Sequence, residues 1–221
     1  MPMDRHLSPR RTRLDQHGTT LMEMVITLAV FTVIMMVIVL LWEQSQRAYF
    51  RGATAAELQQ NARVALEQMT REIRQAGYDP CRYIGVAGTC ATTSAFDPVT
   101  AGAFPIQTHT ATSLWVRADR DASGDVTPGG TNPPEENVCF RFAGGQILRK
   151  TTGVDCTSGG VELARNITGL TFTYLKADGT AATLADGSDI NLVQVAITAQ
   201  EMFMGAPVTV TLRSNIRLRD Q

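Results

Sequence analysis

The hydrophobic pattern divides the chain into one long apolar run, an amphipathic stretch and a series of short alternating runs. Residues 24–42 carry no charged side chain. At about 1.5 Å per residue this run spans roughly 28 Å as a helix, close to the hydrocarbon thickness of a bilayer. Helices in the core of soluble proteins rarely stay apolar on every face for so long. The run therefore predicts a transmembrane helix.

The helix is expected to continue through residues 43–76, which contain no proline and many helix formers. Apolar side chains recur there at spacings of three and four, at Leu58, Ala62, Ala65, Met69 and Ile73. Charged side chains lie off this stripe, so we expect the stripe to pack against a protein core. Gly77 is the expected C-cap, and Asp79-Pro80 the expected stop.

Runs rich in β-branched and aromatic residues follow, and each predicts a strand. They cover residues 113–118, 137–142, 146–151, 167–176, 190–199 and 207–218. Gly144-Gly145 predicts a hairpin, and residues 177–179 predict another turn. Residues 78–112 are interpreted as loop. Several runs alternate apolar and polar side chains, which is typical of an antiparallel meander with one solvated face. The expected fold class is α+β, a long helix packed on an antiparallel β-sheet.

The distribution of charge predicts how the chain is oriented in the membrane. The net charge is −1, so no strong attraction to nucleic acid is expected. Arginines are concentrated before the apolar run, at Arg5, Arg10, Arg11 and Arg13. Such residues stay in the cytoplasm, which places the C-terminal part outside it. A cleaved secretory signal would have a shorter apolar core followed by small residues, whereas LLWEQSQRAYF follows here.

One carboxylate, Glu23, lies at the start of the apolar run, where burying its charge in hydrocarbon would cost several kcal/mol. It stands five residues after Gly18, which ends the basic leader, and Thr19 follows that glycine directly. A basic leader ending in glycine, with a glutamate fifth after it in an apolar helix, resembles the type IV prepilins and related pseudopilins. Thr19 departs from the phenylalanine that is commonest in this family.

The resemblance implies a processing step and an assembly role. A prepilin peptidase in the membrane would cut between Gly18 and Thr19 and methylate the new α-amino group. Glu23 would then meet the terminal amine of a neighbouring subunit inside a filament. The expected parts are a leader (1–18), a transmembrane and filament-core helix (19–42), an amphipathic continuation (43–77) and a β-rich head domain (78–221).

The segment REIRQAGYDP, residues 71–80, is similar to PilW-type minor pilins more than to J-type pseudopilins of type II secretion. This resemblance implies a subunit without enzymatic activity that helps to prime a pilus near its tip, in a fibre that serves cell adhesion. Its partners would be the peptidase, other minor pilins and the major pilin. The precursor would lie in the inner membrane as a single-pass protein. A type II secretion pseudopilin and a signal-anchored periplasmic enzyme remain as alternatives.

Cysteines are expected on the outer side of the membrane, at Cys81, Cys90, Cys139 and Cys156. An even count in an oxidising compartment favours disulfides, with three connectivities open. Pairing of sequence neighbours, 81 with 90 and 139 with 156, is preferred. No CxxC spacing indicates zinc or redox cycling.

The acidic loop at residues 118–130 is the one feature typical of a metal site. Oxygen side chains recur at alternate positions, at Asp119, Asp121, Ser123 and Asp125. Gly124 allows a tight turn, as in loops that bind calcium. The glutamate expected twelfth is absent, since Gly130 stands there, and Glu135 or Glu136 is a substitute. The alternative is a solvated acidic turn, and no cofactor is otherwise expected.

Overall fold

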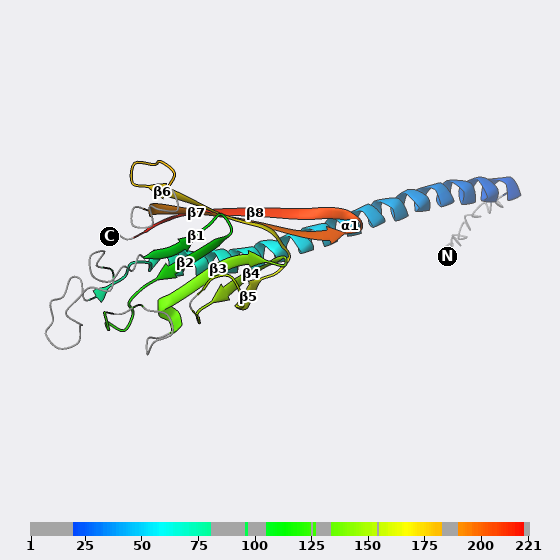
Figure 1. Ribbon diagram of the computed structural model, residues 1–221. Coiled ribbons are helices and arrows are strands. Elements are labelled where there is room, and N and C mark those ends of the chain that lie inside the picture. Colours follow the sequence, from blue (N-terminus) through cyan, green and yellow to red (C-terminus); the bar gives the residue numbers. More distant parts are fainter. Residues whose placement is uncertain are drawn as a thin grey trace, which may run out of the picture. The chain divides into compact units, whose positions relative to one another are not determined.

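The computed structural model describes residues 20–80, 96, 105–124, 126, 134–153, 155–182 and 190–218. The chain divides into two units, Met1–Tyr49 and Phe50–Gln221. One helix, α1 (Leu21–Arg74), begins in the first unit and ends in the second (Figure 1). All the strands described belong to the second unit.

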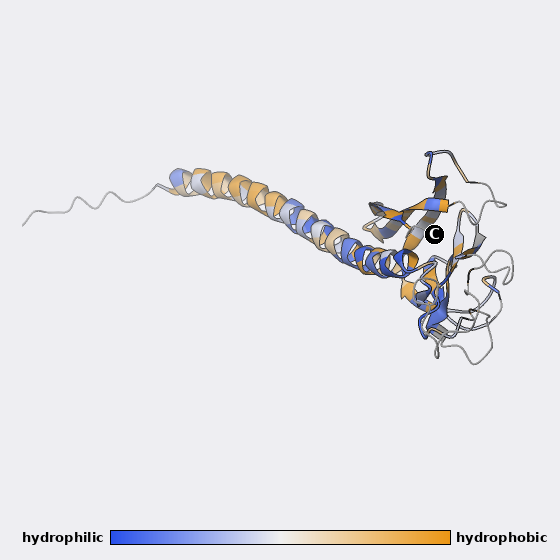
Figure 2. Ribbon diagram, turned by 90° about the vertical axis from the view of Figure 1, so that its left-hand side faces the viewer, coloured by the Kyte–Doolittle hydropathy of each residue, from blue (hydrophilic) through white to orange (hydrophobic). Residues whose placement is uncertain are grey.

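The apolar part of α1 confirms the helix expected there. Every side chain from residue 21 to residue 42 is exposed. Figure 2 shows this part as mostly hydrophobic and the part that follows it as mixed. The helix is long and apolar enough to cross a membrane.

In the second unit α1 presents the predicted stripe to a protein core. Each of its five residues is at most 1% exposed, namely Leu58, Ala62, Ala65, Met69 and Ile73. They share one cluster with residues of both sheets described below. The two alanines leave room for the sheets to approach the helix, and the larger side chains each contribute about 1.5–3 kcal/mol by burial. Gly77 has a φ of 79°, as expected for a C-cap after the helix ends at Arg74.

The described strands form two antiparallel sheets, not the single sheet expected. The first sheet has the order β1-β2-β3-β4-β5 and the second β6-β7-β8 (Figure 1). Their bounds are β1 (Ile106–His109), β2 (Ser113–Arg117), β3 (Asn137–Ala143), β4 (Gln146–Lys150), β5 (Val161–Ala164), β6 (Ile167–Lys176), β7 (Ile190–Phe203) and β8 (Ala206–Arg217), with a 3₁₀ helix, η2 (Pro134–Glu136), before β3. The six predicted strands are all present, whereas β1 and β5 were not predicted.

Two tight turns set the register of the long hairpins. Gly144 and Gly145, with φ of 59° and 77°, join β3 to β4 as predicted. Met204 and Gly205, with φ of 48° and 78°, join β7 to β8 in the same way. Two successive residues at positive φ match the right-handed twist of the flanking strands. The second hairpin was missed because methionine is uncommon at such a position.

The two sheets are linked through a buried phenol. The Tyr174 hydroxyl, on β6, donates to the carbonyl oxygens of Thr110 at 2.8 Å and Ser113 at 3.2 Å, at the turn between β1 and β2. The Phe172 amide donates to the Ala111 carbonyl at 2.8 Å beside it. Burial raises the pKa of Tyr174, so the phenol keeps the proton that it donates.

An ion pair fastens α1 to the first sheet. The Arg149 Nε, on β4, lies 2.9 Å from Oε1 and 3.1 Å from Oε2 of Glu72. The Glu72 side chain is 10% exposed, and the Gln68 amide also donates to it. Removing one partner of such a pair leaves a poorly solvated charge. The pair therefore selects one orientation of the helix on the sheet.

We predict that Tyr174→Phe lowers the free energy of unfolding by about 1–2 kcal/mol, because two carbonyls lose their shared donor while the ring stays packed. Urea unfolding of the detergent-solubilised full-length protein measures this change. An unchanged midpoint and slope would show that the phenol does not link the sheets energetically.

Candidate functional site

The start of α1 is built as a capped helix terminus. The Thr20 carbonyl accepts hydrogen bonds from the amides of Glu23 at 3.0 Å and Met24 at 3.2 Å. The Thr20 hydroxyl also accepts from the Glu23 amide at 3.4 Å. A threonine N-cap with a glutamate three residues later is the spacing of a capping box. Glu23 thus lies in the first turn, where the helix dipole favours a carboxylate.

The Glu23 carboxylate is exposed, and no salt bridge to it is found within the described residues. A cation that pairs with Glu23 would have to come from outside the described residues, for example from another subunit. Gly18 and Thr19, the predicted processing site, lie outside the described residues.

Polar side chains within the apolar run are satisfied by the helix itself. The Thr27 hydroxyl donates to the Met24 carbonyl at 2.9 Å, and the Thr32 hydroxyl to the Ala29 carbonyl at 2.8 Å. Internal bonds of this kind suit a helix surrounded by hydrocarbon, which offers no partner to a free hydroxyl. The exposed apolar surface around them needs lipid or other helices to cover it.

The charged part of α1, which follows the apolar run, begins with an ion pair along the helix. Glu43 and Arg47 lie 2.7 Å apart, and both side chains are more than half exposed. An i, i+4 pair of this kind contributes only a few tenths of a kcal/mol. It marks the point where the sequence of α1 changes from apolar to charged and polar residues.

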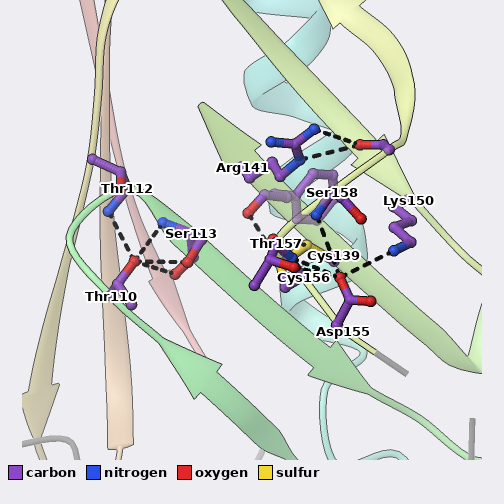
Figure 3. Close-up of a disulfide and its surroundings, with 12 residues drawn as sticks. Thr110, Thr112, Ser113, Cys139, Arg141, Lys150, Asp155, Cys156, Thr157 and Ser158 are labelled. Atoms are coloured by element: carbon purple, nitrogen blue, oxygen red, sulfur yellow. Dashed lines mark hydrogen bonds and ion pairs between the residues drawn. A yellow bond between two sulfur atoms is a disulfide. The ribbon is translucent and has the colours of Figure 1, made fainter. Parts of the chain in front are cut away.

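The disulfide between Cys139 and Cys156 confirms one of the two predicted pairings (Figure 3). Cys139 lies on β3 and packs with Cys156 and Trp115 in a small buried cluster. The two cysteines are 17 residues apart, and closing a loop of that size contributes about 3 kcal/mol. Cys81 and Cys90 lie outside the described residues, so their pairing stays a prediction.

Polar contacts hold the loop that carries Cys156 in place. Asp155 Oδ1 accepts from the amide and hydroxyl of Thr157 and from Lys150 Nζ (Figure 3). The Thr157 bonds, and then Lys150, hold the pKa of Asp155 below its usual range. The Arg141 guanidinium donates twice to the Gly159 carbonyl, at 3.1 and 2.8 Å. The disulfide therefore joins two segments that are already ordered around it.

The structure brings the acidic loop together with a glutamate. Ligand oxygens of Asp119, Asp121 and Glu136 lie within 4.8 Å of one another. Glu136 ends η2, and it was one of two glutamates considered from sequence. Ser123 contributes its amide, which donates to Asp121 Oδ1 at 2.9 Å. Asp125 lies outside the described residues.

A long N-terminal helix, apolar in its first part and packed against antiparallel sheets in its second, defines a pilin-like protein. The family model of PpdB, prepilin peptidase-dependent protein B, matches residues 51–218. The chain therefore belongs to this family, whose name states dependence on prepilin peptidase. A search of curated proteins found no match. The matched range excludes the leader and the apolar run, so the features of Glu23 are separate support for the same class of protein.

Proposed function

We propose that the chain is a minor type IV pilin of the PilW type, without enzymatic activity. Prepilin peptidase cleaves it after Gly18 and methylates Thr19. The precursor waits in the inner membrane with its C-terminal domain outside the cytoplasm. It then joins other minor pilins and the major pilin, near the tip of a fibre whose assembly it helps to prime.

Glu23 is the observation that carries this proposal. In a simple membrane anchor, a carboxylate in the first turn does no more than cap the helix and complement its dipole, and burying its charge in hydrocarbon would cost several kcal/mol. In a processed subunit, cleavage creates an α-amino group that is cationic near neutral pH. A neighbour's amine pairs with Glu23 by a charge-assisted hydrogen bond that is strong in apolar surroundings. The pair forms only when two helices stack in one register, so the charge links extraction from the membrane to assembly.

The shape of α1 supports the same role. Its apolar part is exposed on all faces, so it can exchange lipid contacts for contacts with neighbouring helices. Its second part is bound to the head domain by the buried stripe and by the Glu72–Arg149 pair. Contacts between apolar helices can thus change while the head domain keeps its own core.

We predict that Gly18→Val leaves an uncut precursor, because a branched side chain crowds the peptidase cleft next to the scissile bond. The precursor should be about 2 kDa heavier than the mature form, from eighteen residues at the average residue mass of this chain. Immunoblotting of cells with and without the peptidase measures this difference. Gly18→Ala is the graded control and should be cut more than Gly18→Val. Normal maturation of Gly18→Val would remove Gly18 as the cleavage determinant.

We predict that Glu23→Gln leaves membrane insertion intact and reduces co-assembly with partner pilins. Glutamine keeps the size and the capping geometry but cannot neutralise a neighbour's amine. Affinity capture of partner pilins from solubilised membranes measures co-assembly. Glu43→Gln is the matched control, since Glu43 pairs with Arg47 in its own helix, and it should capture partners normally. If the Glu23→Gln variant captured as much partner pilin as the wild type does, this result would contradict the proposed pairing.

The same capture separates the pilus from its main alternative. A pseudopilin of type II secretion would share the processing step and the need for Glu23. It would recover pseudopilins and secretion components in place of the major pilin. Recovery of those proteins would replace the pilus with a secretion role while keeping the processing account.

A further inference from the structure

Three carboxylates from two segments converge beside the end of β2. Asp119 and Asp121 follow this strand, and Glu136 comes from η2 just before β3. Their ligand oxygens lie within 4.8 Å of one another. Oxygens on opposite sides of a calcium ion are at most about 5 Å apart, because each Ca–O distance is about 2.3–2.6 Å. The spacing therefore suits one shared cation.

Two of these side chains are buried, each with one oxygen bonded and one not. Asp119 is 0% exposed and Glu136 is 1% exposed. Glu136 Oε1 accepts from the amides of Arg120 at 2.8 Å and Asp121 at 3.2 Å, and Asp119 Oδ2 accepts from Gly124 at 2.9 Å. Asp119 Oδ1 and Glu136 Oε2 are buried without a hydrogen-bond partner. Backbone amides thus orient both carboxylates through one oxygen and leave the other oxygen of each without a hydrogen-bond partner.

Such an arrangement is unfavourable by itself. A buried carboxylate oxygen that lacks a partner loses its hydration without compensation. Burial raises the pKa of both Asp119 and Glu136. The charges of Asp79 and Asp121 raise the pKa of Asp119 further, and those of Asp121 and Asp119 raise the pKa of Glu136 further. The nearby arginine Arg120 directs its guanidinium to Gln75 Oε1, at 2.6 Å. The cluster therefore brings three acidic groups together, and two of them, Asp119 and Glu136, are shielded from water.

We propose that Asp119, Asp121 and Glu136 bind one calcium ion, through Asp119 Oδ1, Glu136 Oε2 and the Asp121 carboxylate. All three ligands are hard oxygens, which select calcium or magnesium over softer metals. Asp121 is exposed, so water completes the six to eight ligands of calcium on that side. Magnesium binds less well, because it demands octahedral geometry and gives up its waters reluctantly.

The ion ties three segments of the head domain together. The Asp119 amide donates to the Tyr78 carbonyl at 2.8 Å, and the Gly77 amide donates to the Arg117 carbonyl at 2.9 Å, just after α1 ends. The Ala118 amide donates to the Glu136 carbonyl at 3.0 Å. Binding at the cluster thus stabilises the junction of the helix end, the loop after β2 and the start of β3.

Thermal unfolding of the full-length protein in detergent tests this site. With few protein ligands, the dissociation constant should lie near 10⁻⁴–10⁻³ M. Calcium at about tenfold that value should raise the melting temperature by about 3–6 °C relative to EDTA. Magnesium at the same concentration should raise it less. Equilibrium dialysis with radioactive calcium should find one ion per chain.

Matched variants assign the effect to these residues. Glu136→Gln keeps the acceptor for the two amides but removes the charge, so calcium should no longer raise its melting temperature. In EDTA this variant should melt at or above the wild-type temperature, because a like-charge contact is gone. Glu135→Gln, the exposed neighbour in the same 3₁₀ helix, should respond to calcium as wild type does.

Asp121→Asn is a second test variant, and it changes an exposed ligand without altering the buried residues Asp119 and Glu136. Its side chain is exposed, and asparagine keeps the acceptor for the Ser123 amide, so the fold should persist while calcium affinity falls at least tenfold. Absence of calcium binding by the wild type would overturn the site and leave a solvated acidic turn. Binding that is undiminished in both Glu136→Gln and Asp121→Asn would place the ion elsewhere. Equal or tighter binding of magnesium would overturn the assignment to calcium.

Discussion

The constraint on which the structure depends is that one helix, α1, meets two different surroundings along a continuous backbone. After Glu23 its first part is apolar on every face, and its threonines bond back to the helix, so only Glu23 needs water or a charged partner there. Its second part buries only the stripe that begins at Leu58. The change falls where Glu43 and Arg47 pair on the surface. A single element therefore combines a surface suited to a membrane with a helix that packs into the core of the head domain.

In the head domain, two small sheets cover the apolar stripe on the second part of α1. Residues of both sheets share a cluster with the stripe of α1. Apolar burial is non-directional, so it does not by itself select one orientation. The Glu72–Arg149 pair and the Tyr174 hydroxyl are directional, and they fix the helix to one sheet and the sheets to each other. The Cys139–Cys156 disulfide joins β3, the middle strand of the first sheet, to the loop before β5.

Elements long enough to repeat their hydrophobic pattern several times were predictable from the sequence. Short elements, and features that depend on contacts between distant segments, were not. The stripe of α1 and the six longer strands repeat often enough to show their period. The strands β1 and β5 have four residues each, too few for alternation to show. Division into two sheets depends on contacts between distant segments, such as Tyr174 with Thr110. At the acidic cluster the alternating aspartates were visible, but only the turn of η2 selects Glu136 over Glu135.

The central claim is that the exposed apolar helix belongs to a processed subunit and not to a fixed anchor. Mass spectrometry of the mature N-terminus, on protein recovered from cells with an active prepilin peptidase, tests this claim most directly. The account predicts a chain that begins at Thr19 and carries a methyl group on its α-amine. A chain that retains its leader, or begins elsewhere without methylation, would contradict it.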